Sequence, residues 1–317
     1  MLKVMPALLL GTAIVLSPLS YAAAGADEVE ALQILANLHD EDEFTRNIDS
    51  DGGDRIRLAQ RLTMLTQKVA ASSCALTSDV AIEESHDHLE EAMHEVDIIV
   101  DALLNGNDVL HVFGPEERRL TAHDIQEFRE EWNETHGAIE SVLADGHDVD
   151  NAHIIDDHNL SLLEKASILE ADITSQYALP YELTQADSLM LNIAGRQLML
   201  TQKMAKDACE IWTGYHADLG REDLEKTMVI FENSLNALLT GLPAAGIQAA
   251  PTPEIKTDLD HILARWDIIR GNLDLLLAGE ELDVDQKFEI FHDFNLELEE
   301  INHLVHDYKQ YTQRGHG

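Results

Sequence analysis

Two related segments lie 135 positions apart in this chain, and their similarity keeps its register. Residues 56–70 read IRLAQRLTMLTQKVA, and residues 191–205 read LNIAGRQLMLTQKMA. Further pairs follow downstream with the same offset or one position less: Cys74 and Cys209, Met93 and Met228, residues 102–106 and 237–241, and Trp132 and Trp266. Similarity sustained over several segments indicates an internal duplication. The chain should therefore contain two copies of one module.

Apolar residues recur every three or four positions in both copies. The pattern is clear at two sets of positions: Leu58, Leu62, Leu65 and Val69, and Leu224, Met228, Phe231, Leu235 and Leu238. This spacing predicts amphipathic helices with one buried stripe, and almost nothing alternates with the period of a strand. Each copy has four such segments joined by short connections, which favours an antiparallel four-helix bundle. We expect an all-α fold of two tandem modules, at residues 40–178 and 179–314.

Several helix ends are marked by local residue chemistry. Thr121 with Asp124 fits a capping box, and Thr252 before Pro253 fits a helix start. Gly106 and Gly241 fit helix ends, where glycine accepts a positive φ.

The first 26 residues resemble a secretory signal peptide. Lys3 precedes an apolar stretch, which ends in small residues between Ala22 and Ala26. This order is typical of a cleaved signal, so we expect a periplasmic protein that does not span the membrane after cleavage. A retained membrane anchor is the alternative.

The chain is strongly acidic, with a formal net charge of −39 that becomes −40 if Lys3 is removed with the signal. Such a surface repels nucleic acid and anionic lipid, so neither is an expected partner. Proteins of salty habitats share this composition, so acidity alone does not require a cationic partner.

Residues 193–206, which read IAGRQLMLTQKMAK, resemble the first helix of the PilJ and NarX type periplasmic sensor domains. The first copy resembles them less closely, because Gln60 replaces the motif glycine and Val69 the methionine. The resemblance implies a four-helix bundle whose first helix pairs with another first helix about a twofold axis. Here one chain could supply both helices, related by a pseudo-twofold axis.

In nitrate sensors of that family, an arginine from each paired helix clamps one anion. The corresponding positions here are Thr63 and Leu198, so the nitrate clamp is missing as written. Other motif residues remain. The resemblance therefore implies eight candidate ligand-binding positions: Arg61, Thr63, Gln67, Lys68, Arg196, Leu198, Gln202 and Lys203.

The first helix of the first copy also carries a basic cluster, made of Arg55, Arg57, Arg61 and Lys68 with no acid among them. These side chains could hold a small anion by charge-assisted hydrogen bonds. Alternatively, they pair with acids on neighbouring helices.

The two cysteines, Cys74 and Cys209, occupy equivalent positions in the two copies. In an oxidising compartment they could form one disulfide, closing a loop of about 135 residues and stabilising the fold by roughly 4–5 kcal/mol. Two separate buried thiols are the alternative.

Many of the 16 histidines lie among acids, and three Glu-His pairs have the i, i+3 spacing that can share a metal ion on a helix. The pairs are Glu91 with His94, Glu289 with His292, and Glu300 with His303. Glu91 and His94 have no equivalent in the second copy. Solvated acidic helix faces are the alternative to zinc or copper binding.

No nucleophile elbow, phosphate loop or Cys-His arrangement is visible, so we expect neither an enzyme nor a cofactor. We expect a periplasmic sensor-like protein that binds a small anion or another small ligand. Its expected partner is a membrane-bound chemoreceptor, sensor kinase or pilus-linked transducer. The alternatives are a zinc- or copper-buffering protein and a structural helical adaptor.

Overall fold

The computed structural model describes residues 51–177 and 185–314. The predicted signal peptide at residues 1–26 and the predicted boundary between residues 178 and 179 lie outside the described residues. Within them the fold is all-α, as predicted.

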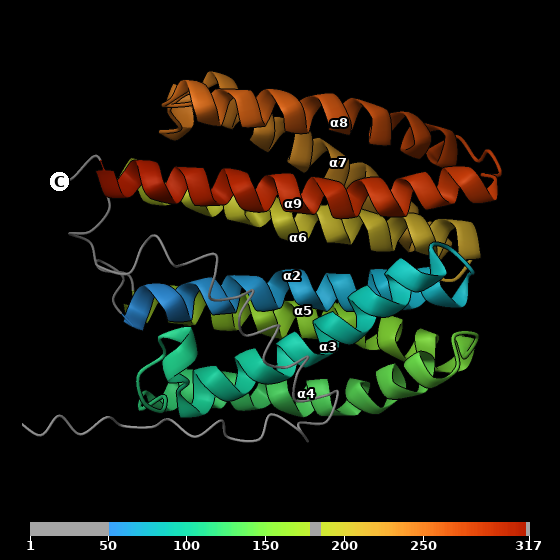
Figure 1. Cartoon of the computed structure of the whole chain (residues 1–317), viewed down its shortest axis with the longest axis horizontal. Helices are drawn as coiled ribbons and strands as arrows, with labels where there is room; N and C mark the ends of the chain where they lie inside the picture. The colour runs from blue at the N-terminus through green and yellow to red at the C-terminus, as the bar shows by residue number, and fades with distance from the viewer. Residues whose placement is uncertain (1–50, 178–184, 315–317) are drawn as a thin grey trace, which may run out of the picture.

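The first four described helices form one bundle (Figure 1). They are α2 (Asp51–Thr77), α3 (Ile82–Asn105), α4 (Arg119–Ala144) and α5 (Val149–Tyr177). The predicted stripe of α2, from Leu58 to Val69, is buried in a core that includes Phe128 and Trp132 of α4. Burial of these large apolar side chains is the main force holding the bundle together.

The next four helices form a second bundle with the same helix order. They are α6 (Gln185–Thr213), α7 (Ala217–Thr240), α8 (Pro253–Leu277) and α9 (Val284–Arg314). Phe231 of α7 and Trp266 of α8 pack with ring centroids 4.9 Å apart in its core.

The two bundles repeat local details of the backbone. Ala81 before α3 has φ 48° and His216 before α7 has φ 50°. Gly106 and Gly241 end α3 and α7 with φ 87° and 83°, a conformation that glycine adopts without strain. Each is followed by a short 3₁₀ helix, Asp108–Leu110 or Pro243–Ala245. These matches agree with an internal duplication, whose boundary stays a prediction.

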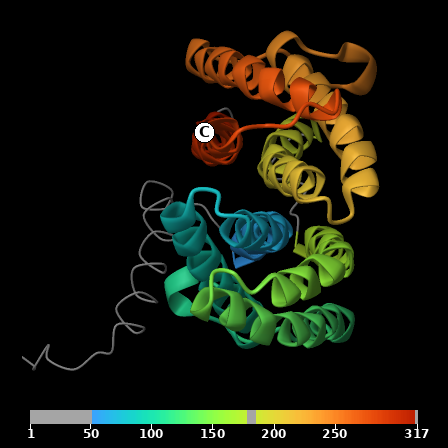
Figure 2. The same cartoon turned by 90° about the vertical axis from the view of Figure 1, so that its right-hand side faces the viewer.

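The two bundles meet along α2 and α6, which lie side by side (Figure 2). Leu198 and Met199 of α6 pack against the cores of both bundles. We call the contact between α2 and α6 the seam. α5 and α9 lie on opposite sides of it, and we call these sides its two flanks. Among the described residues, no helix has both the length and the apolar character needed to cross a bilayer.

Candidate functional site between the bundles

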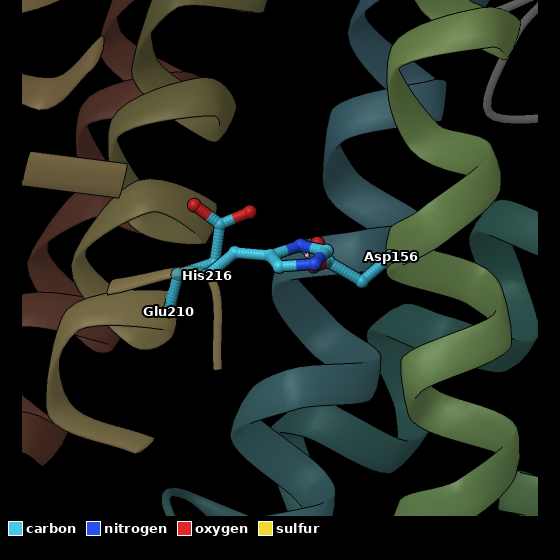
Figure 3. Close-up of side chains that lie close together, drawn as sticks. All are labelled: Asp156, Glu210 and His216. Carbon is cyan, nitrogen blue, oxygen red and sulfur yellow. Dashed lines mark hydrogen bonds and ion pairs between the residues drawn. The ribbon is translucent and has the colours of Figure 1, made fainter. Parts of the chain in front are cut away.

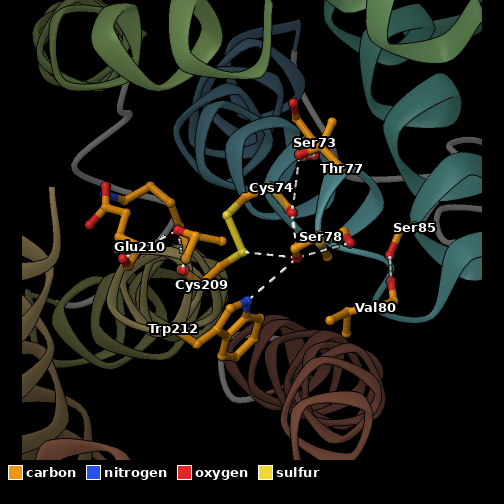
Figure 4. The surroundings of a disulfide bond; sticks show 12 residues. Ser73, Cys74, Thr77, Ser78, Val80, Ser85, Cys209, Glu210 and Trp212 are labelled. Carbon is orange, nitrogen blue, oxygen red and sulfur yellow. Dashed lines mark hydrogen bonds and ion pairs between the residues drawn. A yellow bond between two sulfur atoms is a disulfide. The ribbon is translucent and has the colours of Figure 1, made fainter. Parts of the chain in front are cut away.

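A disulfide joins the two central helices (Figure 4). Cys74 of α2 and Cys209 of α6 are bonded, with their Cα atoms 6.2 Å apart. Trp212 Nε1 donates a hydrogen bond to Ser78 Oγ, which lies 3.9 Å from Cys209 Sγ. The bridge connects equivalent positions, and it therefore fixes the axial register of α2 against α6.

A cavity of about 410 Å³ opens between α2, α6 and α9, on one flank of the seam. Both apolar and cationic side chains line it. The lining residues are Arg57, Gln60, Arg61 and Met64 of α2, Gly195 and Leu198 of α6, and Asn302, His303, Val305, His306 and Lys309 of α9. Three permanent cations and two histidines thus line a space large enough for a small molecule.

Each residue of the basic cluster on α2 faces an acid. Arg61 pairs with Glu95 of α3, Lys68 Nζ lies 3.0 Å from Glu91, and Arg57 lies 3.5 Å from Asp54. Arg61 and Lys68 therefore pair with acids on a neighbouring helix, as the alternative interpretation expects, whereas Asp54 lies on α2 itself. Arg57 and Arg61 also line the cavity.

The buried Arg55 holds the loop between α3 and α4. Its guanidinium donates hydrogen bonds to the carbonyls of Leu103 and Gly114, at 3.1 and 2.8 Å, and lies 3.6 Å from Glu116. Arg55 thus binds one carbonyl at the end of α3 and one in the loop that follows, and it does not line the cavity.

Gln67 and Gln202 do not face each other across the seam. Gln67 donates to Asn159 of α5 at 3.2 Å, and Gln202 donates to Asn295 of α9 at 3.4 Å. Each glutamine is buried inside its own bundle. The partner amides on α5 and α9 draw the two glutamines inward, so neither side chain reaches across the α2–α6 contact.

The other candidate positions divide between the two flanks. Leu198 and Arg61 line the cavity, whereas Thr63 and Arg196 interact with Glu170 of α5, on the opposite flank. Lys203 Nζ lies 3.0 Å from Asp207 and 2.9 Å from Asp223, as part of the second bundle.

Glu170 shows how the seam accommodates a carboxylate. Burial is the dominant effect and raises the pKa of Glu170, whereas Gln60, Thr63 and the charge of Arg196 oppose the shift. The bonded amides Asn159 and Asn295 are 136 positions apart, and the same offset relates Glu170 to His306, which lines the cavity. One flank of the seam therefore carries its own carboxylate, and the other carries a histidine beside the cavity.

The three predicted Glu-His metal pairs take other partners. His292 Nδ1 lies 3.0 Å from Glu84, Glu300 pairs with Arg265 at 2.7 Å, and Glu91 pairs with Lys68. His94 is half-buried and Glu289 accepts from Asn272. In the part of the chain that the structure describes, two groups of three possible ligands occur, Asp156 with Glu210 and His216, and Asp258 with His303 and Asp307. Only His303 belongs to a predicted pair.

Comparison with known proteins relates the second bundle to a sensor family. Residues 183–287 match the family described as type IV pili methyl-accepting chemotaxis transducer N-term, or PilJ. The second bundle is PilJ-like. The matched segment covers α6 to α8 and the start of α9, and it includes Gly195 and Leu198 of the cavity wall. No curated protein and no solved structure matches the chain significantly.

The PilJ family is a family of non-catalytic sensor domains, and the match supports a role in signal transduction. The match covers most of the second bundle and none of the first, in line with the weaker motif of the first copy. Of the cavity residues of α9, His303 was predicted only as half of a metal pair, and His306 and Lys309 were not predicted. Their helix approaches α2 only in the folded chain, so no local pattern marks them.

Proposed function

We propose that this protein is a periplasmic sensor module that binds a small anion in the cavity between α2, α6 and α9. It passes the signal to a separate membrane-bound chemoreceptor, sensor kinase or pilus-linked transducer. The observation that carries the proposal is a cationic cavity at the junction of the first helices of the two bundles. The PilJ match and the disulfide, a bond typical of oxidising compartments, support the role and the location.

The wall of the cavity favours an anion with an apolar part. Arg57, Arg61 and Lys309 supply positive charge, while Met64 and Leu198 supply apolar surface. Arg61 also forms an ion pair with Glu95. Because a guanidinium has five N–H donors, Arg61 could bind an anion and Glu95 at the same time. Because Leu198 stands where the nitrate clamp has arginine, nitrate is not the favoured ligand.

The opposite flank indicates which anion fits best. There the carboxylate of Glu170 lies among Gln60, Thr63 and Arg196. At the equivalent position beside the cavity, His306 provides no carboxylate. We therefore favour a small carboxylate, such as acetate or lactate, as the ligand.

The test compares ligand-induced thermal shifts of the wild-type chain with those of His306→Glu. The panel contains acetate, lactate, nitrate and nitrite, each at the same ionic strength as a sodium chloride reference. A ligand that prefers the folded state raises apparent stability, by about 2.7 kcal/mol at one hundred times its dissociation constant. We expect a carboxylate to raise the Tm of the wild type and not that of His306→Glu, because the new side chain carries its own carboxylate to the cavity.

His261→Glu is the matched control, because it makes the same substitution at an exposed position of α8. It should keep the full response. The proposal would be overturned if no anion shifted the wild-type Tm, or if His306→Glu responded as the wild type does.

A further inference from the structure

A second polar cluster lies at the disulfide end of the seam, where α5 meets the connection between α6 and α7 (Figure 3). His216 Nδ1 lies 3.0 Å from Asp156 Oδ2, and His216 Nε2 lies 3.6 Å from Asp157 Oδ1. Tyr215 donates a hydrogen bond to Asp157 at 2.9 Å and stacks on His153 with ring centroids 3.5 Å apart. These contacts hold the His216 imidazole against α5.

Glu210 completes the cluster from the last turn of α6. The residue is only 3% exposed, and its Oε2 has no hydrogen-bond partner. Its Oε1 accepts from Lys206. A Cβ at Gly220 of α7 would lie 2.7 Å from that Oε2, so the glycine makes room for the carboxylate. A buried carboxylate oxygen without a donor is costly, and it requires a physical explanation.

The geometry points to a site for one divalent transition metal ion, zinc by its chemistry, held by Asp156, Glu210 and His216. One atom from each residue lies within 4.8 Å of the other two. Zinc bonds of 2.0–2.2 Å to nitrogen and oxygen in a tetrahedron place ligand atoms about 3.3 Å apart, so small side-chain movements close the shell. Water or Asp157 can supply the fourth ligand.

Charge around the site favours a cation. Lys206 neutralises part of the cluster through Asp207 and Glu210, and Lys203 pairs with Asp207 and Asp223. Asp156 and Asp157 have no lysine or arginine among these ion pairs. Their partner is His216, whose neutral imidazole is the form that binds metals. An imidazole with carboxylates suits zinc better than calcium or magnesium, which prefer oxygen ligands alone.

Burial raises the pKa of Glu210 to about 8, with Lys206 opposing the shift and Asp156 and Asp207 adding to it. Desolvation of the charged form is the cause, and a cation bound beside Glu210 would offset it as Lys206 does in part.

Within residues 51–177 and 185–314, the first bundle has no equivalent of this site. At the positions equivalent to Glu210 and His216 the first bundle has Ala75 and Ala81, which pack against Phe291 of α9. The contact of Ala75 and Ala81 with α9 is therefore apolar, whereas the related contact of Glu210 and His216 with α5 is polar. Metal bound at the polar contact would link α5 to α6 beside the disulfide, away from the anion cavity.

The test is a calorimetric titration of the full-length, EDTA-treated and dialysed protein with zinc chloride. Glu210→Gln keeps the side-chain shape and removes the ligand charge, and His216→Ala removes the imidazole. His303→Ala is the matched control, because His303 belongs to the more exposed group with Asp258 and Asp307. We expect the wild type and the control to bind zinc at one stoichiometric site. In the other two variants the zinc affinity should fall at least about tenfold, as loss of a ligand predicts.

Cobalt(II) provides an independent readout, because a tetrahedral site gives intense visible absorption that exposed carboxylates do not. Circular dichroism before metal addition checks that each variant is folded, and a folded Glu210→Gln is sufficient for the test. The inference fails if the wild type shows only weak, multiple binding, or if His303→Ala loses the tight site while Glu210→Gln keeps it. Weak, multiple binding would leave the anion proposal intact, because Asp156, Glu210 and His216 do not line the anion cavity. A tight site lost in His303→Ala would instead place the metal at His303, in the wall of that cavity.

Discussion

At the scale of single residues, Glu297 of α9 is the most unusual group in the second bundle. It is fully buried, and its carboxyl oxygens make no hydrogen bond within the described structure. Arg265 Nε lies 3.7 Å from its Oε2. Burial, together with the charges of Glu300 and Asp293, raises the pKa of Glu297 to about 9 against the opposing effect of Arg265. The folded chain therefore binds a proton here at neutral pH.

We predict that Glu297→Gln stabilises the protein at high pH. A carboxyl whose folded pKa is raised contributes stability at low pH, which is lost as the pH rises from its ordinary value of 4.5 towards 9. Glutamine does not titrate, so the Tm of the variant should exceed that of the wild type at pH 9 and match it near pH 5. The expected gain is at least about 2–4 °C, the shift for one kcal/mol in a large domain.

The measurement is a series of thermal unfolding curves from pH 5 to pH 9. Glu164→Gln, at an exposed position of α5, is the control and should leave the pH dependence unchanged. A constant difference between Glu297→Gln and the wild type at every pH would show that Glu297 does not carry this titration.

At the scale of helices, the bond between Cys74 and Cys209 is the strongest constraint on α2 and α6. It joins residues 135 positions apart. Closing so long a loop removes entropy from the unfolded chain, which stabilises the fold by about 4–5 kcal/mol on the chain-entropy model. We predict that Cys74→Ser with Cys209→Ser lowers the free energy of unfolding by up to this amount, measured by urea titration.

Reduction of the wild type by a thiol should produce the same loss, and it should not affect the double variant. If reduction left the urea midpoint of the wild type unchanged, the bridge would contribute nothing to stability.

The helices could be predicted because their determinants are local. The stripes of α2 and α7 are buried as the spacing indicates, and Thr252 caps α8 by accepting from Ile255 N. The capping box at Thr121 was wrong, because α4 begins at Arg119 and the Thr121 hydroxyl donates to Asp172 of α5. A hydroxyl near a helix start can satisfy a neighbouring helix as well as its own, and spacing does not distinguish the two.

The sites were less predictable because each draws on helices distant in sequence. The register of α9 against α2 places His306 and Lys309 at the cavity, and only packing determines that register. Glu210 and His216 left a weak signal, since a comparison of the two copies finds alanines in the equivalent places, Ala75 and Ala81. A charged residue that replaces alanine on a buried helix face is a reason to look for a partner.

At the scale of the whole molecule, charge is the dominant feature. The chain has 60 acidic and 21 basic residues, so most carboxylates have no basic partner of their own. Like charges repel one another more strongly in the compact state than in the unfolded chain, so a large net charge destabilises the fold. Salt weakens this repulsion, and it also weakens the ion pairs at the surface, which contribute little individually.

We predict that the Tm rises with sodium chloride from about 10 to about 150 mM, where the screening length shortens from about 30 to about 8 Å. This range lies below the concentrations at which salts act chiefly by exclusion from the protein surface, so the rise reports screening. Sodium chloride and tetramethylammonium chloride should give the same rise, because screening depends on ionic strength and not on the cation. A Tm that fell with salt would show that ion pairs such as Arg265 with Glu300 outweigh the repulsion among the remaining acids.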